Sequence, residues 1–223
     1  KRLAYSMMGV KDASRVMLVQ FHQSYSYEDF IEGYRPSGEG FELVKGAFYS
    51  FCKKAADDEE NDYFFIIDEI NRGNLSKIFG ELFMLIESDK RGPKNKLQLL
   101  YSSELFYVPR NVYIIGMMNT ADRSLAMLDY ALRRRFAFVE LRPAFDSDGF
   151  CAYRAGLGHT LFEALVREVE SLNRAIIKDE SLGEGFCIGH SYFCNMDADT
   201  CTDAALASIV EYELIPMLKE YWF

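Results

Sequence analysis

Residues 64–72, FFIIDEINR, join a run of four apolar side chains directly to two carboxylates. A continuous apolar run without alternation is typical of a strand that is buried on both faces of a parallel sheet. In open α/β sheets, ligands bind beyond the carboxyl ends of the strands. The stretch therefore predicts an α/β fold with a functional site at Asp68 and Glu69.

Three more apolar runs have the same continuous character, at residues 16–21, 112–118 and 136–141. Each is predicted to be a buried strand of the same sheet. The apolar residues of 75–86 fall on one helical face, and residues 123–134 predict a second helix. Strands that alternate with helices in this way indicate an α/β domain with a parallel sheet.

Two inserted segments interrupt this alternation. Residues 33–46 are rich in glycine and predict a loop or a small hairpin. Residues 97–101 and 105–108 predict a β-hairpin just before the third strand. The chain also starts within a predicted helix, whose C-terminal cap is Gly9.

The character of the chain changes after the fourth predicted strand. Residues 161–176 and 204–218 both have helical spacing, and the second helix is expected to be disturbed near Pro216. The sequence therefore predicts two domains, an α/β core over residues 1–145 and a small helical domain over residues 146–223.

The composition narrows the classes of function. With a net charge of −9, the 223 residues lack the basic excess of a DNA-binding surface, so any DNA contact is expected to be local or to belong to another part of the protein. Five cysteines without a C-x-x-C motif favour a reducing, cytoplasmic location with free thiols. No run approaches the ~20 apolar residues of a membrane span.

Polar side chains that suit phosphate chemistry follow the predicted strands. Of two adjacent acids, one can hold Mg²⁺ and the other can accept a proton from an attacking water, so Asp68 and Glu69 fit these roles. Asn119 ends the third strand and can orient that water. The arginines at 133–135 can neutralise the charge of a phosphoryl group in transfer. Together these residues predict a nucleoside triphosphatase.

Four stretches resemble the McrB family, the AAA+ GTPase subunits of modification-dependent restriction systems. The M-N-T-A-D-R-S string is the most specific part of the resemblance, which runs through nearly the whole chain. The stretches are VQFHQSYSYEDFIEGYRP (19–36), FFIIDEINRGNLSKIFGELFMLIE (64–87), VYIIGMMNTADRSLAMLDYALRRRF (112–136) and IGHSYF (188–193).

The resemblance implies a P-loop AAA+ module with a helical lid, and it implies roles for single residues. Asp68 is similar to the Walker B metal carboxylate, and Glu69 is similar to the catalytic glutamate. Asn119 resembles the sensor 1 residue. Arg134 and Arg135 resemble arginine fingers, which act on the nucleotide of a neighbouring subunit, and one residue of the triple arginine run is expected to serve structure.

Two interpretations of residues 119–122, N-T-A-D, remain open. In the first interpretation the string reads guanine, because it is similar to the N-K-x-D motif of regulatory GTPases and the carboxylate of Asp122 can accept hydrogen bonds from guanine. The family order instead places Asn119 near the γ-phosphate and leaves Asp122 to cap a helix. His190 lies where the family's second domain approaches the nucleotide, so a nucleotide contact and a packed core histidine both stay possible.

The implied function is hydrolysis of GTP with Mg²⁺, which drives DNA translocation in a ring that is expected to be a hexamer. A McrC-type endonuclease subunit would cut the DNA, and a domain outside these residues would recognise the modified base. The 223 residues contain no G-x-x-x-x-G-K-[ST] loop, so these residues alone are expected to be inactive. A MoxR-like AAA+ ATPase and a non-hydrolysing interaction module are the alternatives.

Overall fold

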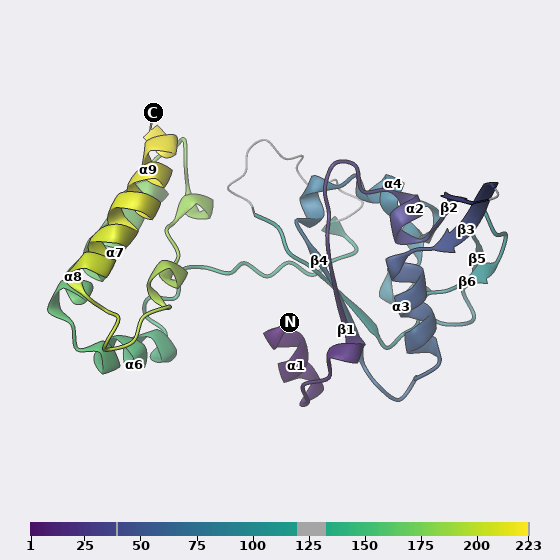
Figure 1. The fold of residues 1–223 in the computed structure, drawn as a ribbon, viewed down its shortest axis with the longest axis horizontal. Helices are drawn as coiled ribbons and strands as arrows, with labels where there is room; N and C mark the ends of the chain where they lie inside the picture. Colours follow the sequence, from purple (N-terminus) through teal and green to yellow (C-terminus); the bar gives the residue numbers. More distant parts are fainter. Residues whose placement is uncertain (39, 120–132, 223) are drawn as a thin grey trace. The chain divides into compact units, whose positions relative to one another are not determined.

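The computed structural model describes residues 1–38, 40–119 and 133–222 (Figure 1). The chain divides into two compact units, Lys1–Phe138 and Val139–Phe223. The predicted division after residue 145 stays a prediction, and residues 139–145 belong to the second unit in the structure. Among the described residues, no helix combines the length and the apolar character needed to cross a membrane.

A three-stranded parallel sheet forms the centre of the first unit, in the order β1-β4-β7. The central strand is β4 (Tyr63–Asp68), whose first five residues are buried. It pairs with β1 (Val16–Gln20) on one edge and with β7 (Val112–Gly116) on the other. Three of the four predicted strands and their parallel arrangement are therefore confirmed. Their predicted burial holds for β4 alone, since β1 and β7 are the edge strands of this sheet and are partly exposed.

The fourth predicted strand, at residues 136–141, is wrong. These residues form no strand, and Val139 and Leu141 are 81% and 92% exposed. A segment forms a β-strand only when its backbone groups pair with a neighbouring strand, and an exposed segment without one bonds to water instead. In the part of the chain that the structure describes, β7 is the last strand on its side of the sheet, and residues 136–141 pair with no strand.

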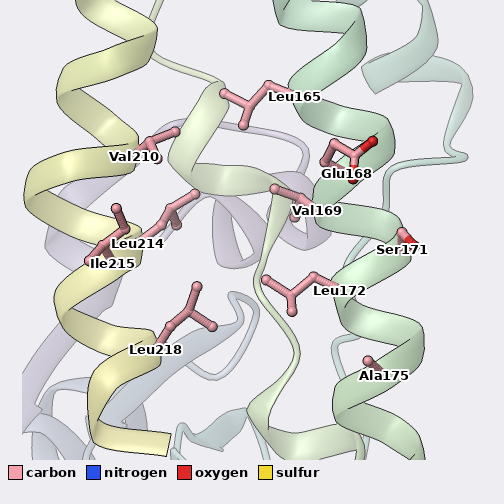
Figure 2. Close-up of a pocket in the computed structure, with 10 residues that line it drawn as sticks. All are labelled: Leu165, Glu168, Val169, Ser171, Leu172, Ala175, Val210, Leu214, Ile215 and Leu218. Atoms are coloured by element: carbon pink, nitrogen blue, oxygen red, sulfur yellow. The ribbon is translucent and has the colours of Figure 1, made fainter.

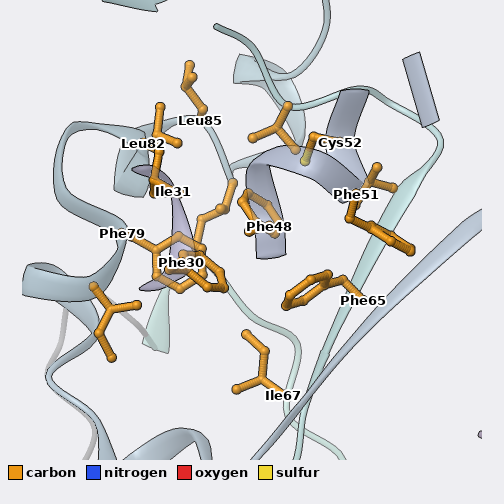
Figure 3. Packing of buried hydrophobic residues seen from close by; sticks show 14 of the residues in the cluster. Phe30, Ile31, Phe48, Phe51, Cys52, Phe65, Ile67, Phe79, Leu82 and Leu85 are labelled. Atoms are coloured by element: carbon orange, nitrogen blue, oxygen red, sulfur yellow. The ribbon is translucent and has the colours of Figure 1, made fainter. Parts of the chain in front are cut away.

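Helices cover both faces of the sheet, because successive side chains of β4 point to opposite sides. Phe64 and Ile66 pack with Ala4 of α1 (Arg2–Met8), which ends at the predicted cap, Gly9, with a φ of 69°. Phe65 and Ile67 face the main core (Figure 3). That core is covered by α2 (Tyr27–Phe30), α3 (Ala47–Ala56) and α4 (Leu75–Phe79).

Aromatic rings fill the main core. The Phe30 ring stacks on Phe48 at a centroid distance of 4.7 Å and meets Phe65 and Phe79 edge-on at 5.6 and 4.7 Å (Figure 3). Stacked and edge-on pairs are the favourable arrangements of aromatic quadrupoles. The core therefore connects α2 directly to the sheet and to the segment that follows β4.

The predicted helix over residues 75–86 is interrupted. The α4 helix ends at Phe79, and Gly80 has a φ of 52° before a 3₁₀ segment, η3 (Gly80–Met84). A Cβ atom at Gly80 would lie 3.0 Å from the Tyr27 ring, so the chain bends where only glycine fits. The apolar face is kept, since Leu82 is fully buried.

Both inserted segments form hairpins, which decides between the loop and the small hairpin predicted for residues 33–46. Residues 33–46 form an antiparallel pair, β2 (Glu32–Ser37) and β3 (Gly40–Lys45). The second hairpin is shorter than predicted, since only β5 (Leu97–Gln98) and β6 (Leu105–Phe106) pair. The remaining short turns of the first unit are η1 (Ala13–Arg15), η2 (Ile70–Arg72) and η4 (Ser88–Lys90).

A buried carboxylate holds the two hairpins together. Glu32 is 0% exposed, and it accepts hydrogen bonds from the backbone N–H groups of Tyr101 and Ser102 at 2.9 and 2.8 Å. It also accepts from Lys45 Nζ at 2.7 Å. A charge in the protein interior is tolerated only when it is paired in this way, so Glu32 fixes the geometry of both hairpins.

Lys45 continues this network to Glu104 in the turn of the second hairpin. Glu104 accepts from Lys45 Nζ at 3.0 Å, from Lys53 Nζ at 2.6 Å and from the Tyr49 hydroxyl at 2.7 Å. Burial acts to raise the pKa of Glu104, but the three hydrogen bonds outweigh it and lower that pKa from 4.5 to about 2.

The network predicts a loss of stability in acid. Because the folded-state pKa of Glu104 lies below its unfolded value, its contribution is present above pH 4.5 and is lost as the pH falls towards about 2. We expect Glu104→Gln to remove about 1 to 2 kcal/mol of this contribution, since solvent screens a partly exposed carboxylate. Melting temperatures recorded from neutral to acid pH check this, and the exposed Glu42→Gln is the control. Equal acid sensitivity of the wild type and Glu104→Gln would contradict the prediction.

The second unit is helical, and both predicted helices are confirmed. It consists of α6 (Asp148–Leu157), α7 (Thr160–Lys178) and a last helix built from α8 (Asp203–Ile209), η7 (Val210–Leu214) and α9 (Ile215–Trp222), with short turns at η5 (Glu184–Phe186) and η6 (His190–Phe193). The η7 segment is a π-helical turn just before Pro216. A proline clashes with the carbonyl four residues earlier, so the expected disturbance is present.

Candidate functional site

Asp68 and Glu69 lie where β4 leaves the sheet. The Asp68 side chain is half-buried, and its Oδ1 accepts a hydrogen bond from the Glu69 N–H at 3.1 Å. The Asp68 carbonyl accepts from the N–H of Phe21 at 2.9 Å, which ties the end of β1 to the same level. Both acids therefore stand at the carboxyl edge of the sheet, as the sequence predicted.

Glu69 adopts a backbone conformation that non-glycine residues rarely adopt. Its φ is 52°, and among the described residues Ser103 is the other non-glycine residue with a positive φ. Such strain persists where surrounding structure enforces it, and it is concentrated at functional sites. The Glu69 side chain turns towards Arg72, whose Nε donates to Oε2 at 3.1 Å.

The fold brings Asn119 to the turn that carries these acids. The N–H of Met117 donates to Ile67 O at 2.8 Å, and the N–H of Ile70 donates to Met117 O at 2.9 Å. Asn71 Nδ2 lies 3.4 Å from the carbonyl oxygen of Asn119. Asp122, the candidate for guanine recognition, falls in 120–132, outside the described residues.

Gly116 allows β7 to approach this turn closely. A Cβ atom there would lie 2.6 Å from Cδ1 of Ile70, which follows Glu69 directly. A larger residue would displace Ile70 or the strand. The end of β7 can therefore form hydrogen bonds with the turn after β4, because Gly116 has no side chain to keep them apart.

The arginines at 133–135 differ in their surroundings. Arg135 is buried, with 7% of its side chain exposed, and its Nη2 lies 2.8 Å from Oε1 of Glu87. Its guanidinium carbon is 4.3 Å from the centroid of the Phe83 ring. Arg133 and Arg134 are exposed. The predicted arginine fingers are thus one exposed and one buried guanidinium.

The donor set at the end of β4 suits Mg²⁺. Mg²⁺ is usually held by one or two carboxylates together with substrate phosphates and water. Within the described residues, Asp68 makes no ion pair, and the hydrogen bond from Glu69 to its Oδ1 leaves Oδ2 for a ligand. The residues present therefore fit a magnesium ion at Asp68.

His190 packs inside the second unit. Its Nδ1 accepts a hydrogen bond from the N–H of Ala144 at 3.0 Å, and its ring meets those of Phe145 and Phe150 at 6.1 and 5.6 Å. These contacts give His190 a structural use, which is to hold the chain that enters the helical unit. A contact of His190 with nucleotide stays a prediction.

The described part of the chain also contains a cavity. It is a groove of about 450 Å³ in the second unit, between α7 and the last helix (Figure 2). Apart from Glu168 and Ser171, its lining side chains are apolar. It offers no group that could act on a phosphate. No cluster of three or more histidine, cysteine or acidic side chains suited to a metal ion occurs among the described residues.

The site and fold define an AAA domain, and the family comparison agrees. Residues 1–136 match the AAA domain of the dynein-related subfamily, and residues 164–223 match the alpha-helical lid domain of McrB. The chain belongs to the AAA domain family, and its lid places it among the McrB-type AAA+ subunits. Members of this family use a nucleotide and Mg²⁺.

Two relatives come from restriction systems. The chain is 52% identical over 231 residues to the EcoKMcrB subunit of a type IV methyl-directed restriction enzyme from Escherichia coli K12, covering 100% of this chain and 50% of the relative. It is 30% identical over 141 residues to component YdiS of the type II restriction enzyme BsuMI from Bacillus subtilis 168, covering 56% and 41%. The chain thus spans about half the length of these relatives or less.

One solved structure, a protein from Cytophaga hutchinsonii, matches over 55% of this chain and 32% of its own length. Its TM-score is 0.36 and its identity is 16%, too low for any argument about this chain.

Sequence reasoning missed two ion pairs that candidate site residues make. Arg72 follows Glu69 by three residues in a helical turn, so the i,i+3 spacing was a usable signal for that pair. Glu87 has no such signal, because it meets Arg135 only when the fold brings distant segments together. The burial of one arginine in a run of three identical residues is likewise invisible in the sequence.

Proposed function

We propose that this chain is the nucleotide-hydrolysing module of a restriction-system AAA+ subunit, which uses GTP and Mg²⁺ to drive DNA translocation. The observation that carries the proposal is the pair of backbone hydrogen bonds of Met117 with Ile67 and Ile70. They join the strained turn at Glu69 to the segment that ends at Asn119. These hydrogen bonds support the proposal because they hold the segments of Asp68, Glu69 and Asn119 at one edge of a parallel sheet, and ligands bind at this edge in such folds.

Each residue then has a role in the proposed reaction. Asp68 would hold Mg²⁺, and the ion would supply positive charge to neutralise the phosphates. Glu69 accepts the proton of the attacking water, and Asn119 orients that water. Arg134 is the exposed guanidinium that can reach the nucleotide of a neighbouring subunit. Arg135 is buried against Glu87, so we assign it a supporting role.

The wider setting of the proposal comes from the relatives. Both are components of restriction enzymes, so we propose a cytoplasmic ring, expected to be a hexamer, that works with a McrC-type endonuclease subunit. The phosphate-binding loop and the domain that recognises DNA would lie outside these residues, since the sequence contains no G-x-x-x-x-G-K-[ST]. The acidic balance of the chain agrees with a DNA contact elsewhere.

Glu69→Gln in the full-length protein tests the reaction directly. The amide keeps the size of the side chain but cannot accept the proton, so we expect turnover to be lost while nucleotide binding and ring assembly persist. Single-turnover hydrolysis and size-exclusion chromatography with nucleotide measure the two properties. Near-normal hydrolysis by this variant would falsify the role of Glu69.

Arg134→Ala separates the exposed arginine from its neighbour. Loss of an arginine finger costs roughly 10³–10⁵ in rate, which is about 4–7 kcal/mol of barrier. We expect this loss for Arg134→Ala, with nucleotide affinity little changed, and a much smaller effect for the matched control Arg133→Ala. A larger loss in Arg133→Ala would reverse the assignment.

Nucleotide competition distinguishes the proposal from a MoxR-like ATPase or an interaction module. We expect GTP to be hydrolysed by the full-length protein and ATP to compete poorly, because Asp122 or a nearby group would accept from the guanine edge. Preferential ATP hydrolysis would favour the MoxR-like alternative. Absence of any hydrolysis with the companion nuclease present would favour the interaction module.

A further inference from the structure

The pair between Glu87 and Arg135 is the best-buried ion pair involving an arginine in the described part of the chain. Only 7% of the Arg135 side chain and 28% of the Glu87 side chain are exposed, and the Nη2–Oε1 distance is 2.8 Å. The guanidinium also lies over the Phe83 ring at 4.3 Å. Arginine combines a carboxylate contact with stacking on an aromatic face in a way that lysine cannot.

The segment that carries Glu87 is itself firmly held. Leu85 and Ile86, the two residues before Glu87, are 0% and 3% exposed. The carbonyl of Ile86 accepts from both Nε and Nη2 of Arg91, at 3.1 and 2.8 Å. Arg91 also donates to the carbonyl of Val112, the first residue of β7. Glu87 thus projects from a platform that is fixed to the sheet.

Arg134 sits directly before this anchored residue. Its own side chain is exposed, whereas Phe136 on the other side of Arg135 packs partly against the main core. The pairing of Arg135 with Glu87 can therefore fix the backbone at this point of the chain, while the adjacent Arg134 keeps its guanidinium in solvent. The position of the free guanidinium is then set by the anchor.

We propose that Glu87 is a positioning residue for the arginine finger. By holding Arg135 against Phe83, it fixes the backbone from which Arg134 reaches the nucleotide bound to the neighbouring subunit. Glu87 therefore serves the active site of the neighbour and not the site of its own subunit. This inference rests on the proposed function, in which Arg134 acts between subunits.

The expected effect follows from the precision that catalysis demands. A displacement of about 1 Å in a catalytic group can cost about 100-fold in rate. We expect Glu87→Ala to lower kcat about 10- to 100-fold, with KM for the nucleotide within about twofold, because nucleotide binding does not involve the displaced arginine. Glu87→Gln keeps the shape of the pair without its charge, and it serves as the second variant if Glu87→Ala folds poorly.

A matched control lies two residues after Glu87. Asp89 is an acid of the same segment, its side chain is 68% exposed, and it pairs with the adjacent Lys90 at 3.1 Å. Asp89→Asn changes the same net charge without touching Arg135. It is expected to leave kcat and KM unchanged.

Mixed rings of full-length subunits reveal on which site Glu87 acts. Rings made from Glu69→Gln and Glu87→Ala subunits contain interfaces at which an intact Glu69 meets a correctly positioned Arg134. They should recover hydrolysis well above either variant alone. Rings made from Arg134→Ala and Glu87→Ala subunits contain no correctly positioned finger and should recover none.

The reference mixture of Glu69→Gln with Arg134→Ala separates two failures. If this mixture recovers but Glu87→Ala recovers only with Arg134→Ala, then Glu87 acts on its own subunit's site and the inference is overturned alone. Wild-type kcat in both Glu87 variants also overturns it alone. If the reference mixture itself shows no recovery, the action of Arg134 between subunits fails, and the inference falls with it.

Discussion

Hydrogen bonding of β4 on both of its edges is the interaction on which the first unit depends. The parallel register sets Gln20 beside Asp68, and the bonds from Met117 N to Ile67 O and from Ile70 N to Met117 O continue the pairing beyond the strands into the following turn. Since buried backbone groups must be paired, this pairing determines where the chain can turn and which side chains it presents. The polar residues at the strand ends are consequently close together, although they come from separate parts of the chain.

Carboxylates of the first unit fall into two kinds, and their hydrogen bonds distinguish them. Glu32 and Glu104 each accept three hydrogen bonds from other segments, two of them on Glu32 from backbone N–H groups. Saturated in this way, they stabilise the two hairpins and have little capacity left for a ligand. Asp68 accepts a hydrogen bond only from the adjacent residue among those described, so its remaining capacity is directed out of the sheet. A carboxylate that the fold leaves unsaturated at a strand end is a candidate for function, whereas a saturated one is a candidate for structure.

Much of the fold could be predicted because β1, β4 and β7 are continuously apolar runs, although only β4 is buried along most of its length. The strand predicted over 136–141 failed because strand formation needs a partner for the backbone, which the apolar character of a segment does not supply; Val139 and Leu141 are in fact exposed. The helix over 75–86 was predicted from its apolar face, and the same face is present, but the kink at Gly80, where a Cβ atom would lie 3.0 Å from the Tyr27 ring, depends on a distant residue that no local pattern contains. For the same reason the residue types of the site could be predicted, but the pairing of Arg135 with Glu87 could not.

The two ion pairs made by candidate site residues differ in the exposure of their arginine, and this difference suits the proposed reaction. The pair of Glu69 with Arg72 is partly exposed, with 23% and 45% of the side chains accessible, and such pairs contribute only about 0–1 kcal/mol. The Glu69 side chain can therefore leave Arg72 for a water molecule at small cost. Its strained backbone meanwhile stays fixed by the hydrogen bonds between the turn and the end of β7. The pair of Glu87 with Arg135 is less accessible on its arginine side, with 7% of Arg135 and 28% of Glu87 exposed, so loss of Glu87 would leave a largely buried guanidinium without this partner. The carboxylate that has to move is thus weakly held, and the arginine that has to stay is strongly held.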